Sequence, residues 1–264
     1  MLEIKNVYKT FNAGTVNEKR ALKNLNLSVA DGDFVTVIGG NGAGKSTMLN
    51  AITGAYSVDY GSISIDGVDV THLPEHKRAK FIGRVFQDPM MGTAATMQIE
   101  ENLAMAARRG KPRTLRIGIT NAEREEYKKQ LATLGLGLED RMTAKVGLLS
   151  GGQRQALTLL MATLQKPKLL LLDEHTAALD PKTAAKVLET TQRIVEENKL
   201  TTIMITHNMR DAIAYGNRLI MMYDGHVVVD VSGEEKKKLT VEQLLNLFSQ
   251  ASGSSEVNDK LILG

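Results

Sequence analysis

Short apolar segments separated by polar turns make up the first part of the chain. Residues 2–7 (LEIKNV), 21–29 (ALKNLNLSV) and 33–38 (DFVTVI) have the composition of β-strands, and the turn-rich stretches NAGTVNEK and ADGD separate them. Residues 61–70 (GSISIDGVDV) alternate apolar and polar side chains around Asp66-Gly67, which predicts a hairpin. We therefore expect a β-rich unit in this part of the chain.

Apolar runs and helical patterns alternate through the rest of the chain. Strands are predicted where apolar residues run together, at 168–174, 201–206, 218–223 and 226–231. Helices are predicted where apolar residues recur every three or four positions, at 99–109, 122–134, 182–198 and 241–250. This alternation is typical of an α/β core with a mainly parallel sheet, and the mostly helical region 88–150 is interpreted as an insertion into it. A polar tail, ASGSSEVNDK, follows the last helix and is expected to be mobile.

One further predicted helix begins in an unusual way. The segment LLSGGQRQALTLLMATL, residues 148–164, is apolar around most of its circumference after Gln153, and Ser150 and Gln153 have the spacing of a capping box. Its first turn is nevertheless Gly151-Gly152, and each glycine costs a helix up to about 1 kcal/mol relative to alanine. Glycine near a helix end is tolerated, which is the plain explanation. The alternative is that an anion such as phosphate approaches the N-terminal N–H groups so closely that no Cβ fits.

The sequence GGNGAGKS, residues 39–46, fits the P-loop pattern G-x-x-x-x-G-K-[ST]. A predicted strand precedes it and a short helix that ends at Gly54 follows, which is the context that a P-loop requires. Lys45 would supply a charge to the β- and γ-phosphates, Ser46 a hydroxyl to Mg²⁺, and Thr47 a hydroxyl toward the α-phosphate. A glycine-rich turn with an exposed lysine is the alternative. The candidate phosphate-binding residues are Gly39, Gly40, Asn41, Gly42, Ala43, Gly44, Lys45, Ser46 and Thr47.

Four further candidate residues lie at the ends of short apolar segments. KLLLLDE, residues 168–174, reads as a buried strand whose acids come only at its carboxyl end, where ligands bind in an open parallel sheet. Asp173 is predicted to hold Mg²⁺ through water and Glu174 to accept a proton from the attacking water, although solvated acids at a strand end are the alternative. His207 ends the strand TTIMITH at the same edge, whereas a lone histidine is more often structural. Gln87, at the end of RVFQ, lies where the core meets the helical region.

Composition limits the possible functions. The 264 residues are 42% hydrophobic and 24% charged, as in an ordinary globular protein with a proper core. The net charge of +3 gives no electrostatic reason to expect a nucleic acid as partner. The absence of cysteine excludes disulfides and thiolate metal sites and fits a reducing compartment. No signal peptide is expected, and the apolar runs are far shorter than the roughly 18 residues of a membrane-spanning helix.

These motifs, in this order, resemble those of the ATP-binding subunits of ABC transporters over most of the chain, residues 2–230. GGNGAGKST is similar to the family's Walker A motif, LSGGQ (149–153) to its signature motif, LLLLDE to Walker B with the catalytic glutamate, and AALD (177–180) to its D-loop. Gln87 and His207 fall where the family has its Q-loop glutamine and switch histidine. A P-loop alone is shared by many NTPases, whereas LSGGQ before LLLLDE, with a histidine after it, is very specific.

The resemblance implies a P-loop NTPase fold of the α/β class. It has a core with a mainly parallel sheet, an N-terminal antiparallel β subdomain and an inserted α-helical subdomain. We place the ATP-binding core at 1–87 and 151–233, the helical subdomain with the signature motif at its end at 88–150, and a C-terminal helix and tail at 234–264.

The resemblance also implies a shared active site. In this family two subunits pack head to tail, and each ATP lies between the P-loop of one and the signature helix of the other. The implied catalytic residues are Glu174, His207, Lys45 and Gln87, and the implied metal-binding residues are Ser46, Gln87 and Asp173. The residues that bind ATP outside the P-loop are implied to be Ser150, Gly151, Gly152, Gln153, Asp180 and an aromatic residue that stacks on adenine, Phe11 or alternatively Tyr8.

One departure from the family is His175, which stands where proline usually follows the catalytic glutamate. Proline would fix φ in this turn, so histidine is expected to loosen it slightly. The ring could meet a backbone carbonyl or the opposing subunit. We expect no loss of hydrolysis, because the acidic pair itself is intact.

The function implied by the resemblance is hydrolysis of ATP with Mg²⁺, coupled to transport of a small solute through a separate membrane permease. The subunit would lie peripherally at the cytoplasmic face of the cell membrane, with a solute-binding protein as an indirect partner. The pattern is similar to that of bacterial importer ATPases paired with lipoprotein solute-binding proteins, including systems assigned to aromatic amino acids such as tryptophan. The alternatives are an exporter ATPase subunit and a soluble ABC-family ATPase without a permease. The basic segment 108–116 could touch lipid headgroups or the permease, or form a solvated loop.

Overall fold

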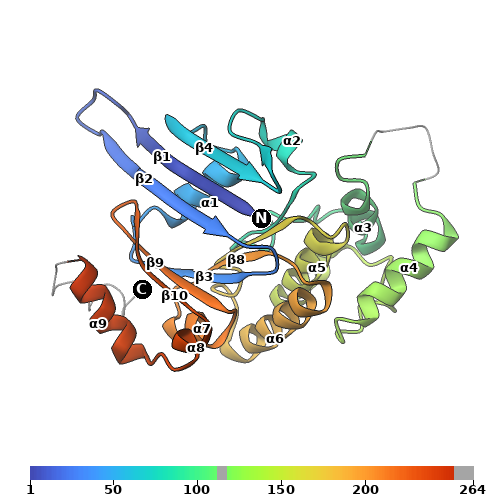
Figure 1. Ribbon diagram of the computed structural model, residues 1–264. Helices are drawn as coiled ribbons and strands as arrows, with labels where there is room; N and C mark the ends of the chain where they lie inside the picture. Colours follow the sequence, from blue (N-terminus) through green and yellow to red (C-terminus); the bar gives the residue numbers. More distant parts are fainter. Residues whose placement is uncertain (112–117, 253–264) are drawn as a thin grey trace.

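The computed structural model describes residues 1–111 and 118–252. Nearly all of the predicted polar tail, and residues 112–116 of the basic segment, lie outside the described residues. Two β-sheets and the helices packed on them form the molecule (Figure 1).

The antiparallel sheet has the strand order β2-β1-β4-β5. Its strands are β1 (Leu2–Phe11), β2 (Lys19–Val29), β4 (Tyr60–Ile65) and β5 (Val68–Asp69). The predicted hairpin at Asp66-Gly67 joins β4 to β5, with Ile65 opposite Val68. β1 is longer than predicted and pairs with β2 through several register shifts, which bring Phe11 opposite Lys19. Bulges of this kind increase the twist of a strand and re-aim the side chains at its end.

The second sheet has the strand order β10-β9-β3-β8-β7-β6. Its strands are β3 (Phe34–Ile38), β6 (Ile82–Val85), β7 (Leu169–Asp173), β8 (Thr202–Ile205), β9 (Arg218–Tyr223) and β10 (His226–Ser232). All neighbours are parallel except β9 and β10, which form an antiparallel pair at one edge. β3, β7 and β8 are almost wholly buried, as expected for parallel strands covered on both faces. The predicted fold class is confirmed.

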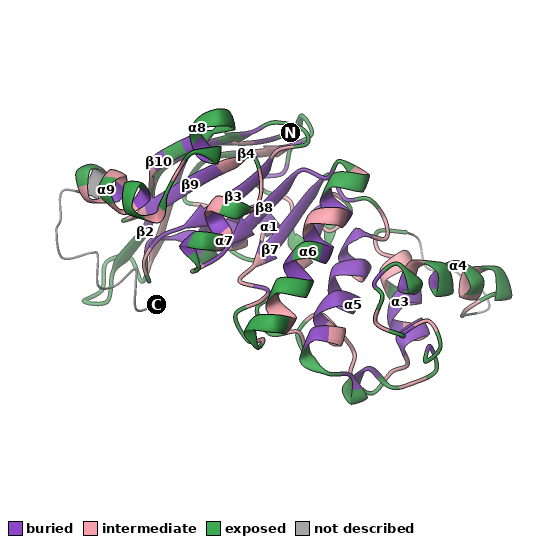
Figure 2. Ribbon diagram, turned by 90° about the horizontal axis from the view of Figure 1, so that it is seen from below, coloured by how far each residue is buried: buried purple, intermediate pink, exposed green. Residues whose placement is uncertain are grey.

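The longer helices begin and end close to the predicted residues. They are α1 (Lys45–Thr53), α3 (Ile99–Ala107), α4 (Asn121–Ala132), α5 (Gly151–Thr163), α6 (Pro181–Asn198) and α9 (Val241–Ser252). The sequence analysis missed the short helices α2 (Glu75–Arg78), α7 (Met209–Ala214) and α8 (Gly233–Lys237), and the 3₁₀ turn η1 (Val146–Leu148). Figure 2 shows that α5 is largely buried, whereas α4 is largely exposed.

Turns take up more of the region between β6 and α5 than predicted. This region was expected to be mostly helical, but residues 87–98 and 133–145 hold turns, bends and one isolated bridge between Gln98 and Lys145. One apolar cluster runs from α3, α4 and α5 to the strands β6, β7 and β8. The predicted division of the chain at 88 and 150 stays a prediction, because this cluster joins the two sides of each boundary.

Candidate functional site

Three predicted site segments follow neighbouring parallel strands. In the sheet order, β3, β8 and β7 lie side by side, with Val37 opposite Ile205 and Asp173 opposite Ile205. The P-loop follows β3, Glu174 follows β7, and His207 comes two residues after β8. Because parallel strands end at the same edge, the topology brings these residues together.

The P-loop backbone depends on glycine at two positions. Gly39 has φ 152° and Gly44 has φ 101°, conformations that residues with a Cβ rarely adopt. A Cβ on Gly39 would lie 2.3 Å from the Met222 carbonyl oxygen, and one on Gly44 would lie 2.7 Å from the Ala21 carbonyl oxygen. No side chain caps the first turn of α1, which begins immediately after Gly44. The N–H groups at this helix start are therefore available to an anion.

Lys45 lies inside this loop. Its Nζ donates to the carbonyl oxygens of Gly39 at 2.6 Å and Gly40 at 3.2 Å, and the residue is 6% exposed. Burial lowers the pKa of the Lys45 ammonium, and the nearby charges of Glu174 and Asp173 partly oppose that shift. The P-loop lysine and the acids at the end of β7 therefore act on one another electrostatically.

A cavity of about 240 Å³ lies over the P-loop. Its lining residues are Phe11, Lys19, Ala21, Asn41, Gly42, Ala43, Gly44, Lys45, Ser46, Thr47, Glu174 and His207. The sequence analysis missed Lys19 and Ala21, because it assigned Lys19 to a turn. Only the folded chain shows that Lys19 belongs to the cavity, because Lys19 pairs there with Phe11 across β1 and β2.

Phe11, and not Tyr8, is the aromatic residue at the cavity. The Phe11 ring packs edge-on against Tyr56 with the ring centroids 5.3 Å apart. Tyr8 packs against Tyr60, with the centroids 6.3 Å apart, and does not line the cavity. Phe11 therefore lies at the cavity, and its predicted stacking on adenine stays a prediction.

Glu174 and His207 form a close pair at the cavity. The Glu174 Oε1 lies 2.6 Å from the His207 Nε2, and the two side chains are 11% and 31% exposed. Glu174 has φ 48°, a left-handed conformation, and its N–H donates to the Ile205 carbonyl at 3.1 Å. A carboxylate and an imidazole that share a hydrogen bond beside the P-loop cavity suit proton transfer to and from water.

Asp173 is engaged by an arginine that the sequence analysis missed. The Asp173 Oδ2 accepts from Arg84 Nη2 at 3.1 Å, and Arg84 Nη1 donates to the Asn50 Oδ1 at 2.9 Å. Within the described residues no group of three His, Asp or Glu side chains could hold a metal ion. Ser46 and Asp173 nevertheless offer hard oxygen donors, the kind that Mg²⁺ uses together with substrate phosphates, so the residues fit that ion.

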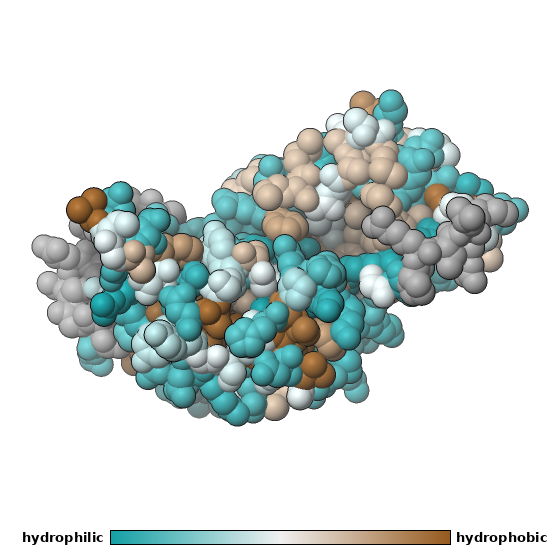
Figure 3. All heavy atoms as spheres, turned by 90° about the horizontal axis from the view of Figure 1, so that it is seen from above, coloured by the Kyte–Doolittle hydropathy of each residue, from teal (hydrophilic) through white to brown (hydrophobic). Residues whose placement is uncertain are grey.

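Gln87 lies outside the cavity. It is exposed, two residues beyond the end of β6, the strand next to β7. Met90 and Met91, which follow it, are 45% and 70% exposed. In Figure 3 the surface has two lobes, one mostly hydrophilic and the other covered largely by weakly apolar residues. The predicted catalytic and metal-binding roles of Gln87 stay predictions.

The signature motif also lies outside the cavity. Ser150 is exposed and caps α5, because its Oγ accepts from the Gln153 N–H at 3.3 Å and the Gln153 Oε1 accepts from the Ser150 N–H at 3.1 Å. The predicted helix start is therefore observed. The predicted ATP-binding roles of Ser150, Gly151, Gly152 and Gln153 stay predictions, since the described chain places none of them at the P-loop cavity.

The structure gives a reason for Gly152 that the sequence analysis did not consider. A Cβ on Gly152 would lie 2.2 Å from the Cγ2 of Thr183 in the first turn of α6. Gly151 is less restricted, since its Cβ would lie 3.2 Å from the Leu179 Cδ2 at the end of a flexible side chain. With the Thr183 side chain in this conformation, the packing of α5 on α6 leaves no space for a Cβ at position 152.

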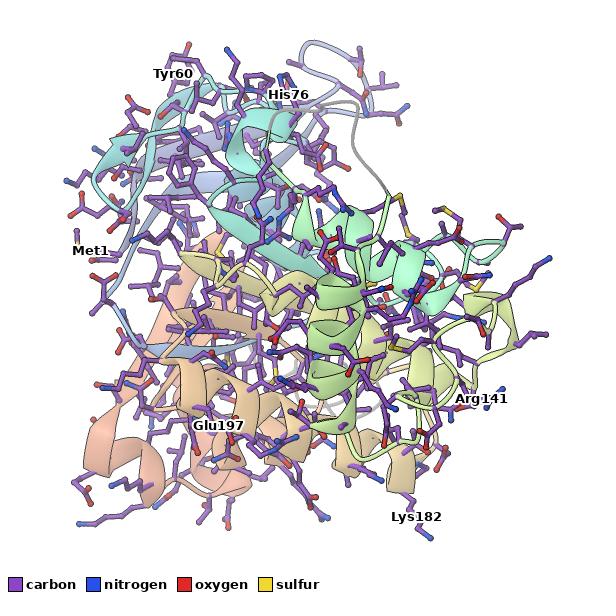
Figure 4. All side chains as sticks on the ribbon, turned by 90° about the vertical axis from the view of Figure 1, so that its right-hand side faces the viewer. Met1, Tyr60, His76, Arg141, Lys182 and Glu197 are labelled. Atoms are coloured by element: carbon purple, nitrogen blue, oxygen red, sulfur yellow. The ribbon has the colours of Figure 1, made fainter. Side chains whose placement is uncertain are left out.

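Asp180 has a structural role at the start of α6. It is the N-cap, and its Oδ1 accepts from the Thr183 N–H at 3.1 Å. Hydrogen bonds from the Thr183 side chain and then from its N–H lower the pKa of the Asp180 carboxyl. Lys182, in the same turn, projects away from the body of the protein (Figure 4). The predicted contact of Asp180 with ATP stays a prediction.

His175 is buried within its own chain. It is 2% exposed, and its Nε2 lies 3.2 Å from the Thr191 Oγ1 on α6. Because the Thr191 hydroxyl donates to the Val187 carbonyl at 2.8 Å, it accepts from the Nε2–H of a neutral ring. Burial lowers the pKa of His175 to about 4. Of the partners considered from the sequence, neither a backbone carbonyl nor an opposing subunit is the one observed.

The fold and the cavity define a P-loop nucleotide-binding protein. The family model described as ABC transporter matches residues 22–177. A tyrosine transport ATP-binding protein of Clostridioides difficile (strain R20291) is 45% identical over 251 residues, which cover 95% of this chain and 100% of that protein. The ABC transporter ATP-binding protein YxdL of Bacillus subtilis (strain 168) is 33% identical over 259 residues, covering 97% of this chain and 96% of that one.

Solved structures agree with the sequence relatives. The dimeric post-hydrolysis state of the ATP-binding cassette MJ0796, bound to ADP and Pi, matches with a TM-score of 0.75 at 32% identity and covers 88% of this chain and 98% of that one. The ADP conformation of the cassette MJ1267 matches with a TM-score of 0.76 at 27% identity, covering 94% and 98%. The chain belongs to the ABC transporter family as an ATP-binding subunit, and it is an ATPase. None of the helices in the described part combines the length and apolar character needed to cross a bilayer.

Proposed function

We propose that this chain is the ATPase subunit of an importer and works as a head-to-tail pair with two shared ATP sites. The observation that carries the proposal is the separation of the site residues within one chain. The P-loop, Glu174 and His207 line one cavity, whereas the exposed helix start at Ser150 lies outside it. A second copy that presents its own Ser150 and α5 N-terminus would complete the phosphate site. The dimeric cassette with ADP and Pi supports this arrangement.

In the proposed reaction, water attacks the γ-phosphorus of ATP. The bond from that phosphorus to the bridging oxygen breaks, and ADP and phosphate form. Glu174 orients the water and takes its proton, and His207, 2.6 Å from Glu174, holds the carboxylate in place. Lys45 leaves the carbonyls of Gly39 and Gly40 for the phosphates. Bound Mg²⁺ would neutralise phosphate charge, with Ser46 and Asp173 as the residues that hold it.

A mixing experiment tests the shared site. Lys45→Ala removes the phosphate cation of one cavity, and Ser150→Arg blocks one helix start without touching the P-loop of the same chain. Each variant alone is expected to hydrolyse ATP poorly. In the mixture, heterodimers combine the intact P-loop of one variant with the intact signature of the other. We expect turnover well above the sum of the separate variants, and a mixture that stays at that sum would refute a shared site.

We further propose that the partner in the membrane is a separate permease, and that the chain lies peripherally at the cytoplasmic face. The apolar residues after Gln87, together with Met105 (49% exposed) and Leu148 (72% exposed), suit contact with another protein. Co-purification in detergent tests this. A permease should be retained by the wild-type chain and lost on Met91→Glu, while Val16→Glu, a fully exposed position on the β1–β2 loop, should retain it.

The solute class that we propose is an aromatic amino acid, delivered by a solute-binding protein. The support is the relative from Clostridioides difficile, named for tyrosine transport, which this chain matches over its full length. The solute leaves no mark on an ATPase subunit, so the test uses the partner. Thermal shift of the binding protein encoded with this chain, against a panel of amino acids, should show its largest stabilisation with tyrosine, phenylalanine or tryptophan. Stabilisation by polyamines or methionine instead would overturn the assignment.

A further inference from the structure

Arg84 occupies an unusual position for a cation. It lies on β6, in register with Leu171 of β7, two residues before Asp173. Side chains two residues apart on a strand share a face, so Arg84 and Asp173 both point to the face of the sheet that α1 covers. Their side chains are 15% and 16% exposed.

The Arg84 guanidinium is held from three directions. It donates to Asp173 at 3.1 Å and to Asn50 of α1 at 2.9 Å, and its carbon lies 4.6 Å from the centroid of the Phe86 ring. Its Nε is buried and has no hydrogen-bond partner within the described part of the chain. A cation fixed in this way cannot follow Asp173 freely, and it cannot leave for solvent without losing all three contacts.

Asp173 is also the carboxylate that the proposed function assigns to Mg²⁺. A cation at the metal site and the fixed guanidinium compete for the same carboxylate, and in a partly buried place their mutual repulsion is weakly screened. The competition for the carboxylate and the charge repulsion both weaken Mg²⁺ binding for as long as Arg84 keeps its charge. No other arginine or lysine is recorded in an ion pair with Asp173 among the described residues.

We infer that Arg84 is a built-in counter-ion of Asp173 that competes with Mg²⁺ and raises the Mg²⁺ concentration needed for tight nucleotide binding. The inference rests on the proposed function, because it takes Asp173 as the metal carboxylate. Arg84 thereby acts as a positioning residue. It holds the carboxylate beside α1 before the metal–nucleotide complex arrives, and it gives up that contact when the complex binds.

The test measures binding and not turnover. A fluorescent, non-hydrolysable ATP analogue is bound to the full chain and titrated with Mg²⁺ from EDTA to millimolar concentrations. Arg84→Met, which keeps the length of the side chain and removes its charge, is expected to lower the Mg²⁺ midpoint roughly three- to tenfold. Arg84→Lys keeps a charge and should leave the midpoint close to that of the wild type.

The matched control is Arg218→Met. Arg218 lies on β9 of the same sheet, its side chain is 19% exposed, and it is paired with Asp230 at the amino end of its strand, away from the cavity. This variant loses the same charge and a similar ion pair, so its Mg²⁺ midpoint should not move. Should Arg84→Met fail to fold, Arg84→Gln removes the same charge with a polar end and carries the same expectation.

Three results distinguish failure of the inference from failure of the proposed function. An unchanged or raised Mg²⁺ midpoint in a folded Arg84→Met variant would overturn the counter-ion role. Failure of the wild-type chain to bind the analogue at any Mg²⁺ concentration would instead count against the proposed nucleotide site. A shift of equal size in Arg218→Met would mean that net charge alone sets the midpoint, and it would also overturn the inference.

Discussion

The N-termini of α1 and α5 both have glycine at or next to the first helical residue. They differ in how they are capped and in whether they face the P-loop cavity. α1 has no side-chain cap, begins after a left-handed Gly44 and faces a cavity that contains a buried lysine. α5 is capped by Ser150, is exposed at its start and faces no cavity of the P-loop in the same chain. A helix N-terminus attracts anions only weakly unless other groups enclose the ligand. The comparison therefore sets an anion-binding helix start at the P-loop cavity against a capped, exposed one, which fits the proposal that α5 of a second copy completes the site.

The largest expected effect is a loss of ATP hydrolysis at the P-loop cavity, with ATP binding retained. Glu174→Gln removes the proton acceptor and keeps the shape of the side chain, so turnover should fall by about 10²–10⁴-fold. ATP binding should persist, and a dimer should accumulate on ATP, visible by size-exclusion chromatography. Lys45→Ala is the contrasting variant, since calorimetry should show weakened ATP binding itself. Wild-type turnover by Glu174→Gln would refute the assigned base.

The next prediction concerns His175, in the turn between β7 and α6. His175 is neutral when folded, with a pKa of about 4 in place of 6.5. Below pH 6.5 the unfolded chain binds a proton that the folded chain excludes, so stability is lost as pH falls from 6.5 toward 4. The full difference corresponds to about 3 kcal/mol.

Urea unfolding at several pH values checks this prediction. His175→Gln should be less dependent on pH over that range than the wild type, although it loses part of the bond to Thr191. Parallel curves for the two proteins between pH 6.5 and 4 would contradict the assigned burial of a neutral imidazole.

A smaller effect tests whether Gly152 serves packing or phosphate. Gly152→Ala places a methyl group against Thr183 and should destabilise the fold by about 1–3 kcal/mol. Adding Thr183→Ser removes the clashing methyl and should restore most of that stability, whereas Gly151→Ala alone should cost little. Thermal unfolding measures all three variants. If the restored double variant also regains turnover, the glycine is needed for packing alone; if turnover stays low, phosphate access requires it as well.

The smallest expected effect concerns Lys19, at the P-loop cavity. The Lys19 Nζ lies 3.5 Å from the position of a Cβ on Gly42, so it adds a second cation above the P-loop. Lys19→Ala should weaken ATP binding roughly two- to fivefold, less at high salt because the charge is exposed. Arg20→Ala is the control, since Arg20 does not line the cavity. Equal losses in the two variants at both salt concentrations would argue against a local contact.

Most residues of the P-loop cavity were predicted from short sequence motifs. The P-loop follows its strand and opens its helix, and Glu174 and His207 follow neighbouring parallel strands, so the strand order brings them to one cavity. The capping box at Ser150 is likewise local, and it is present as predicted. Each of these features depends on residues within a few positions of one another or on the general rule for parallel sheets.

Features that join distant segments could not be predicted. Arg84 meets Asp173 across 89 positions, and no pattern around a single arginine in a strand indicates that partner. Thr183 explains Gly152 only once α5 lies against α6, and Thr191 explains His175 only once that turn is folded. The length of β1 was missed because polar residues on its exposed side interrupt the apolar pattern.

The contact between Thr183 and Gly152 has a mechanical consequence. With no room for even one extra carbon between them, the first turns of α5 and α6 are interlocked, and close-packed interiors deform little. Residues 174–180 connect β7 to α6, so Glu174 lies on the segment that leads into this packed helix start. A displacement of the start of α5 is therefore expected to move the start of α6 with it, through the contact between Gly152 and the Thr183 side chain.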